Sequence, residues 1–113
     1  MKNLIILMGR LGSDPEIKEV NDTQLAKFSL ATDDSYMDKQ GTKHEVTDWH
    51  NIEIWGGLAK VAQNYLKKGA LVYIEGKSKT DQYQNEAGQT QYRHFIRGNV
   101  LKMLDKKKEN GGY

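Results

Sequence analysis

The sequence predicts a small, mostly β domain in which five antiparallel strands are joined by one helix between the third and fourth strands. Two patterns carry this prediction. Residues 46–55 alternate in polarity, as in a half-buried strand, whereas the apolar residues between positions 58 and 66 recur with the period of a helix. The chain has 113 residues, enough for one domain, and its 28% of charged residues beside 37% hydrophobic ones indicates a globular protein.

The first half of the chain contains extended segments separated by polar breaks. Its apolar start is too short for a signal peptide or a membrane span, so we expect a buried strand there. A break surrounds Pro15, the only proline. The expected segments are a first strand at 3–9, extended chain at 16–20, a turn at 21–23, a second strand at 24–32, and a polar loop at 33–45 with a hairpin tip at 39–42.

The third strand, residues 46–55, places both tryptophans of the chain on the face that should meet water. Successive side chains of a strand point to opposite faces, so Ile52 and Ile54 mark the core face, which His50 shares. The opposite face carries Trp49, Asn51, Glu53 and Trp55. One such ring would ordinarily pack against a loop or a subunit. Two on one polar face favour a binding surface.

A helix and two long strands follow. Leu58, Val61 and Ala62 begin the helical pattern, Lys67 and Lys68 suit its last turn, and Gly69 suits a C-cap. We expect a fourth strand at 70–83, a turn at 85–88, a fifth strand at 91–104, and a polar tail at 106–113 that begins a flexible linker outside a domain of residues 1–105. Three strands, a helix and two strands suit the OB-fold, although other small β domains share this order.

The fourth strand repeats the mixture of rings and charges. Val72 and Ile74 should face the core, and the opposite face should carry Tyr73, Glu75, Lys77, Lys79, Asp81 and Tyr83. A net charge of +2 is small for holding a polyanion by phosphate neutralisation alone. Exposed rings can stack on unpaired bases for about 1–3 kcal/mol per base, so single-stranded nucleic acid is the predicted ligand. The candidates for phosphate contact, on or beside strands, are Arg10, Lys27, Lys77, Lys79 and Arg93.

Four stretches of the chain together resemble the bacterial single-stranded DNA-binding protein family: LMGRLGSDPEIK, FSLATDDSYMDKQG, TDWHNIEIWGGLAKVAQNYLKKGALVYIEGK and GQTQYRH. The likeness runs from about residue 2 to about residue 104. It implies an OB-fold, usually a homotetramer, that coats single-stranded DNA in replication, recombination and repair. It also implies a cytoplasmic, nucleoid-associated protein with no enzymatic activity, no metal or other cofactor, and no membrane contact.

The resemblance also implies roles for individual residues. Base-stacking rings fall on Tyr36, Trp49, Trp55 and Tyr83, and subunit contacts on His50 and Tyr73. Gly57 stands where the family often has lysine, and Asp81 adds an acid to a stretch that the family keeps basic, so we expect weak phosphate contact. Long members end in an acidic tip that recruits partner proteins. This chain ends in residues 106–113 without one, so contact with replication and repair proteins stays open.

Other interpretations have less support. His44, His50 and His94 fit no short metal-ligand spacing, and the chain has no cysteine. Asp33, Asp34 and Asp38 lie among turn-forming residues, as in a solvated loop. Two classes remain as alternatives: an OB-type subunit whose rings pack a protein partner, and an oligosaccharide-binding OB module, which would gain little from the basic strand. An enzyme is the least favoured class.

Overall fold

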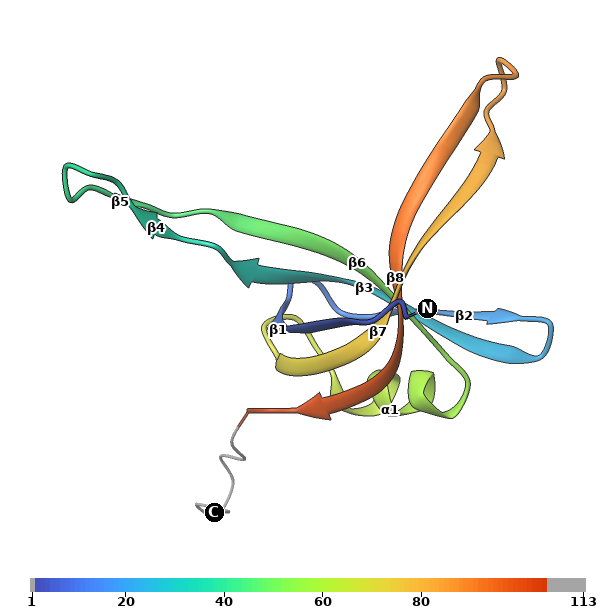
Figure 1. Cartoon of the computed structure of the whole chain (residues 1–113). Helices are drawn as coiled ribbons and strands as arrows, with labels where there is room; N and C mark the ends of the chain where they lie inside the picture. Colours follow the sequence, from blue (N-terminus) through green and yellow to red (C-terminus); the bar gives the residue numbers. More distant parts are fainter. Residues whose placement is uncertain (1, 106–113) are drawn as a thin grey trace, which may run out of the picture.

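A closed barrel forms the centre of the structure, a computed structural model that describes residues 2–105 (Figure 1). Strand β1 is hydrogen-bonded to both β7 and β3, so the sheet order β1-β7-β8-β6-β3-β2 closes on itself and β2 extends from β3. The elements are β1 (Ile5–Leu11), β2 (Glu16–Val20), β3 (Thr23–Asp33), β4 (Tyr36–Met37), β5 (Lys43–His44), β6 (Thr47–Trp55), α1 (Gly57–Tyr65), β7 (Leu71–Gln84) and β8 (Thr90–Met103). The predicted fold class, including the position of the helix, is confirmed.

One pairing in the barrel is parallel. Strands β6 and β8 run in the same direction, with Ile52 opposite Ile96, while the other pairings of the barrel are antiparallel. Strands that alternate in direction around a closed ring must be even in number. A closed barrel of five strands therefore needs a parallel contact, and the sequence order alone does not say where it lies.

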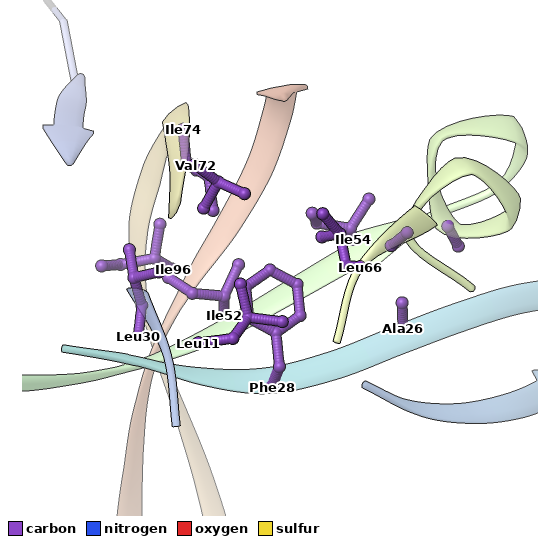
Figure 2. Close-up of a cluster of buried hydrophobic side chains, with 12 residues drawn as sticks. Leu11, Ala26, Phe28, Leu30, Ile52, Ile54, Leu66, Val72, Ile74 and Ile96 are labelled. Atoms are coloured by element: carbon purple, nitrogen blue, oxygen red, sulfur yellow. The ribbon is translucent and has the colours of Figure 1, made fainter. Parts of the chain in front are cut away.

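The core follows from the alternation along β3, β6 and β7. Ile52, Ile54, Val72 and Ile74 are almost completely buried, as the sequence pattern predicts for the inner faces of these strands. Helix α1 packs against β3, β6 and β8 and buries Ala59 and Ala62. Figure 2 shows the cluster that fills the barrel, which includes Leu11, Ala26, Phe28, Leu30, Ile52, Ile54, Leu66, Val72, Ile74 and Ile96.

The helix ends earlier than predicted. Leu66 already has extended backbone angles, so Lys67 and Lys68 lie after the helix and Gly69 is not its C-cap. Tertiary contacts explain the early end. Leu66 is drawn into the core at 6% exposure, the backbone N–H of Lys68 donates to the carboxylate of Asp14, and that of Gly69 donates to the carbonyl of Leu11.

Two arms project from the barrel in different directions (Figure 1). One arm continues β3 and β6 into the β4–β5 hairpin, which lies inside the segment that the sequence pattern assigned to a polar loop. Gly41, with φ of 81°, occupies the predicted tip, and the carboxylate of Asp38 accepts hydrogen bonds from the backbone N–H groups of Gln40 and Thr42. The other arm is the β7–β8 hairpin. The first strand is shifted from its predicted 3–9 to Ile5–Leu11, and the predicted tail at 106–113 lies outside the described residues.

We predict that Gly76→Ala destabilises the fold by about 1–3 kcal/mol, because a Cβ at this position would lie 2.3 Å from the backbone carbonyl oxygen of Arg97. Urea unfolding followed by circular dichroism measures the effect. The matched control is Gly57→Ala, where a Cβ meets nothing within 4 Å and the first turn of α1 accepts alanine. An unchanged unfolding midpoint for Gly76→Ala would contradict the tight contact.

Candidate nucleic-acid interface

The rings and cations singled out in the sequence lie mainly on one face of the sheet. Residues opposite each other in a ladder share a face. Glu53 of β6 lies opposite Arg97 of β8, and Arg97 lies opposite Lys77 of β7. Alternation along the strands then extends this outer face to Trp49 and Trp55 on β6, Arg93 and Phe95 on β8, and Lys79, Asp81 and Tyr83 on β7.

Trp49 lies on the β3–β6 arm with 61% of its surface exposed. Its ring rests against Gly12, where an added Cβ would lie only 2.4 Å from a ring carbon of Trp49 and 2.7 Å from the hydroxyl of Ser29. The backbone N–H of Gly12 donates to the carbonyl of Ser29, which holds the glycine in place. The predicted exposure of Trp49 is therefore confirmed, and its orientation depends on a neighbouring residue without a side chain.

Trp55 lies at the other end of β6 and is half-buried. The guanidinium of Arg97 lies 5.9 Å from the centroid of its ring, within the range of a cation–π contact. Together with Lys79 and Phe95, these residues line a groove of ≈ 300 Å³. A flat aromatic ring beside two cations offers a surface for a base and its phosphate in the same groove.

Tyr36 and Tyr83 lie on the two arms. Tyr83 is 53% exposed near the end of β7, and Tyr36 is 56% exposed on β4. The ring of Tyr36 stacks on that of His44, with centroids 4.9 Å apart. His44 in turn hydrogen-bonds to Asp38, and this bond, with backbone N–H donors, lowers the pKa of the Asp38 carboxyl. A second ring and a capped turn therefore support Tyr36 from one side.

The basic residues predicted to contact phosphate differ in their surroundings. Lys77 and Lys79 are exposed on the outer face of β7. Lys27 lines a separate groove of ≈ 540 Å³ that also includes Glu53 and Arg93. Arg10 is not brought together with them, since it donates to the carbonyl of Gly69, just before β7, and pairs with Asp105, which follows β8.

The burial of Glu53 contradicts a prediction from the sequence. This residue was expected on the water-facing side of the third strand, yet it is only 5% exposed. Arg93 explains the burial, because its guanidinium pairs with the Glu53 carboxylate and also with Asp81 at 2.8 Å. Its hydrogen bonds, first to Glu53 and then to Asp81, raise the pKa of Arg93. The charge of Arg93 is therefore already paired within the protein.

Phe95 and Arg97 are the functional candidates that the sequence analysis missed. They alternate with Arg93 on the last strand around Ile96, which is buried. This alternation is the signal that could have found them, since it is the same period that identified the outer faces of the third and fourth strands.

The two predicted subunit contacts lie away from the groove. His50 is half-buried on the inner face of β6, where its Nε2 lies 2.9 Å from the hydroxyl of Thr32. Tyr73 of β7 donates a hydrogen bond to Glu75, which raises the pKa of the Tyr73 hydroxyl. Its partner in the ladder is Met8 of β1, whose side chain is exposed.

Residues 2–105 show no features of a metal site or a membrane-spanning helix. They contain no group of three or more histidine, cysteine, aspartate or glutamate residues arranged to hold a metal ion. The helix in this part of the chain is too short and too polar to cross a membrane.

Comparison with known proteins identifies relatives over nearly the whole chain. The model of the single-strand binding protein family matches residues 2–104. The single-stranded DNA-binding proteins of Neisseria meningitidis serogroups A and B are each 42% identical over 111 residues, which cover 97% of this chain and 64% of the relative. The chain thus spans a little under two thirds of the length of these curated relatives.

Solved structures of single-stranded DNA-binding proteins also resemble this chain. The structure titled "Plasmodium falciparum SSB complex with ssDNA" has a TM-score of 0.85 and 31% sequence identity, covering 93% of this chain and 97% of that chain. A deletion mutant of the single-stranded DNA binding protein from Thermus aquaticus has a TM-score of 0.80 at 23% identity, covering 92% of this chain and 51% of that one. The second likeness supports the fold alone.

We predict that Gly12→Ala displaces the ring of Trp49, because the new methyl group would occupy the position of the ring edge. In a Trp55→Phe background, Trp49 is the only tryptophan, so its emission reports on this site alone. We expect a red-shifted emission maximum and stronger quenching by acrylamide. Gly57→Ala in the same background serves as the control. Identical emission from the two variants would mean that Trp49 does not rest on Gly12.

Proposed function

The chain belongs to the single-strand binding protein family, and we propose that it binds single-stranded DNA with little sequence preference. The observation that carries this proposal is the position of Trp49 and Trp55 on one outer face, beside cations of β7 and β8. Rings stack on any base, whereas a duplex hides the faces of its bases. The residues proposed to stack are Tyr36, Trp49, Trp55 and Tyr83.

The residues proposed to contact phosphate lie on the same outer face of the sheet as the rings. Lys77 and Lys79 are exposed beside the groove, and Lys27 lies on the neighbouring strand β3, so these residues can follow a backbone that passes over the rings. Arg97 joins them as a cation next to Trp55. Arg93 already pairs with Glu53 and Asp81, and Arg10 is the least favoured of the predicted residues because it contacts Gly69 and Asp105.

The biological role that we propose is protection of single-stranded DNA during replication, recombination and repair in the cytoplasm. Residues 1–105 would act as one DNA-binding domain, by binding rather than by catalysis. This proposal rests on the family and on the ring-lined face.

We further propose that the chain forms a homotetramer. Ile6 and Met8 of β1, with Leu4 just before the strand, form an exposed apolar stripe, and Tyr73 lies beside Met8. Exposed apolar stripes of this kind mark surfaces that pack against a partner. The predicted contact residues His50 and Tyr73 complete the proposed interfaces.

We predict that Trp49→Ala and Trp55→Ala each weaken binding to oligo-thymidine by about 1–3 kcal/mol, roughly 5- to 150-fold, through loss of one stacked base. The measurement is fluorescence anisotropy of a labelled oligonucleotide at low and high salt, with a labelled duplex as the comparison. Tyr65→Ala, which removes an exposed ring of α1, is the matched control. Unchanged affinity in the folded double tryptophan variant would refute stacking. It would favour the alternative that the rings contact a protein partner.

We predict that Met8→Glu and His50→Ala reduce the mass measured by sedimentation velocity while leaving oligonucleotide contacts intact within the smaller species. A charge at Met8 would be buried without a partner in an apolar contact, which is strongly unfavourable. Met37→Glu is the control, since Met37 is also an exposed methionine but lies on β4. Equal mass for all three variants would count against these interfaces.

A further inference from the structure

Arg93 is held between two carboxylates that differ in their access to water. The side chain of Glu53 is 7% exposed, whereas that of Asp81 is 54% exposed, and the guanidinium of Arg93 pairs with both. A buried carboxylate without its cation would be costly, so the pair with Glu53 is the permanent one. The pair with Asp81 lies at the surface, where an ion pair contributes only about 0–1 kcal/mol and can be exchanged.

The position of Arg93 does not depend on Asp81. Its guanidinium lies 4.3 Å from the centroid of the Phe95 ring and forms a hydrogen-bonded ion pair with the buried Glu53, and both contacts hold it in place. Removing Asp81 from the guanidinium would therefore leave Arg93 oriented, with its Nη2 donor open to the groove.

The surroundings of this edge favour an anion. The groove that contains Asp81 and Arg93 also contains Lys79 and Arg97, and neither of these cations has an ion-pair partner within residues 2–105. Lys77 and Arg97 lie directly opposite each other in the ladder, an arrangement of like charges that is unfavourable without an anion nearby. Asp81 is the exposed carboxylate in the groove, and within residues 2–105 its ion pair is with Arg93 alone.

We propose that Asp81 holds the place of a backbone phosphate in the free protein, and that a phosphodiester of single-stranded DNA replaces it on Arg93. The proposal deepens the proposed function and rests on it. Asp81 accepts one hydrogen bond, from Nη2 of Arg93, and an oxygen of a phosphodiester can accept the same charge-assisted bond, so the exchange preserves the geometry of Arg93. Glu53 stays in place because it is buried.

The exchange has a measurable consequence for salt dependence. A cation that neutralises one phosphate of a single strand releases counterions and adds about 0.7 to the slope of log K against log salt. In the wild type, the displaced Asp81 takes up a cation from solution, which offsets that release. Arg93 should therefore contribute little to the slope until Asp81 is removed.

The test is Asp81→Asn, with binding of fluorescein-labelled oligo-thymidine measured by anisotropy over a range of salt concentrations. We expect roughly two- to fivefold tighter binding at low salt and a slope steeper by up to about 0.7. The matched control is Glu86→Gln, which removes an exposed acid at the tip of the same hairpin, away from Arg93. Equal gains from the two variants would overturn the proposal, since any lost acid would then act alike.

A second background removes the arginine without leaving a buried charge. In a Glu53→Gln, Arg93→Gln double variant, Asp81→Asn should bring no gain in affinity and no change in slope. A gain that persists there would mean that Asp81 only repels DNA, and the exchange would be refuted. If the wild type binds oligo-thymidine and Asp81→Asn binds with the same affinity and the same salt slope, this inference alone is overturned. Failure of the wild type to bind oligo-thymidine would overturn the proposed function as well.

Discussion

Strand β1 closes the barrel, and this closure decides which side of each strand faces the core. Strand β1 bonds to β7 along most of its length and to β3 at Arg10 and Leu11. The backbones meet so closely at this seam that a Cβ on Gly9 would lie 2.1 Å from the carbonyl oxygen of Ala31. Once the ring is closed, every strand has one inner face that must be filled and one outer face that is free for binding. The tryptophans are exposed because the isoleucines beside them fill the inside.

The parts of this arrangement that follow from local periodicity could be predicted from the sequence. Alternation along β6 and β7 assigned Ile52, Ile54, Val72 and Ile74 to the core and Trp49 and Tyr83 to the surface, because a period of two leaves only two choices of face. The helix was recognised by its own period. The family resemblance then connected these faces to a ligand, which periodicity cannot name.

Three of the differences between prediction and structure involve contacts between residues far apart in the chain. Glu53 is buried because Arg93 lies beside it, 40 positions away, and a pattern that scores Glu53 as polar cannot include that partner. The helix ends at Tyr65 because Leu66 enters the core and Asp14 binds the backbone of Lys68. Arg97 is a candidate for DNA contact because its guanidinium lies over the ring of Trp55, which belongs to another strand. Sequence patterns predict which face a residue occupies, and tertiary pairing decides what it can do there.

In the proposed function, the charges of the outer face leave most of the affinity to the rings. Arg93 is already neutralised by Glu53 and Asp81, which leaves Lys27, Lys77, Lys79 and Arg97 among the cations of this face without ion-pair partners within residues 2–105. A few phosphate contacts give a weak and salt-sensitive attachment, whereas stacking on exposed rings persists when salt screens the charges. A net charge of +2 is then sufficient. The acids in the groove limit the attraction for any polyanion, and in the proposed function they leave the selection of unpaired bases to Trp49 and Trp55.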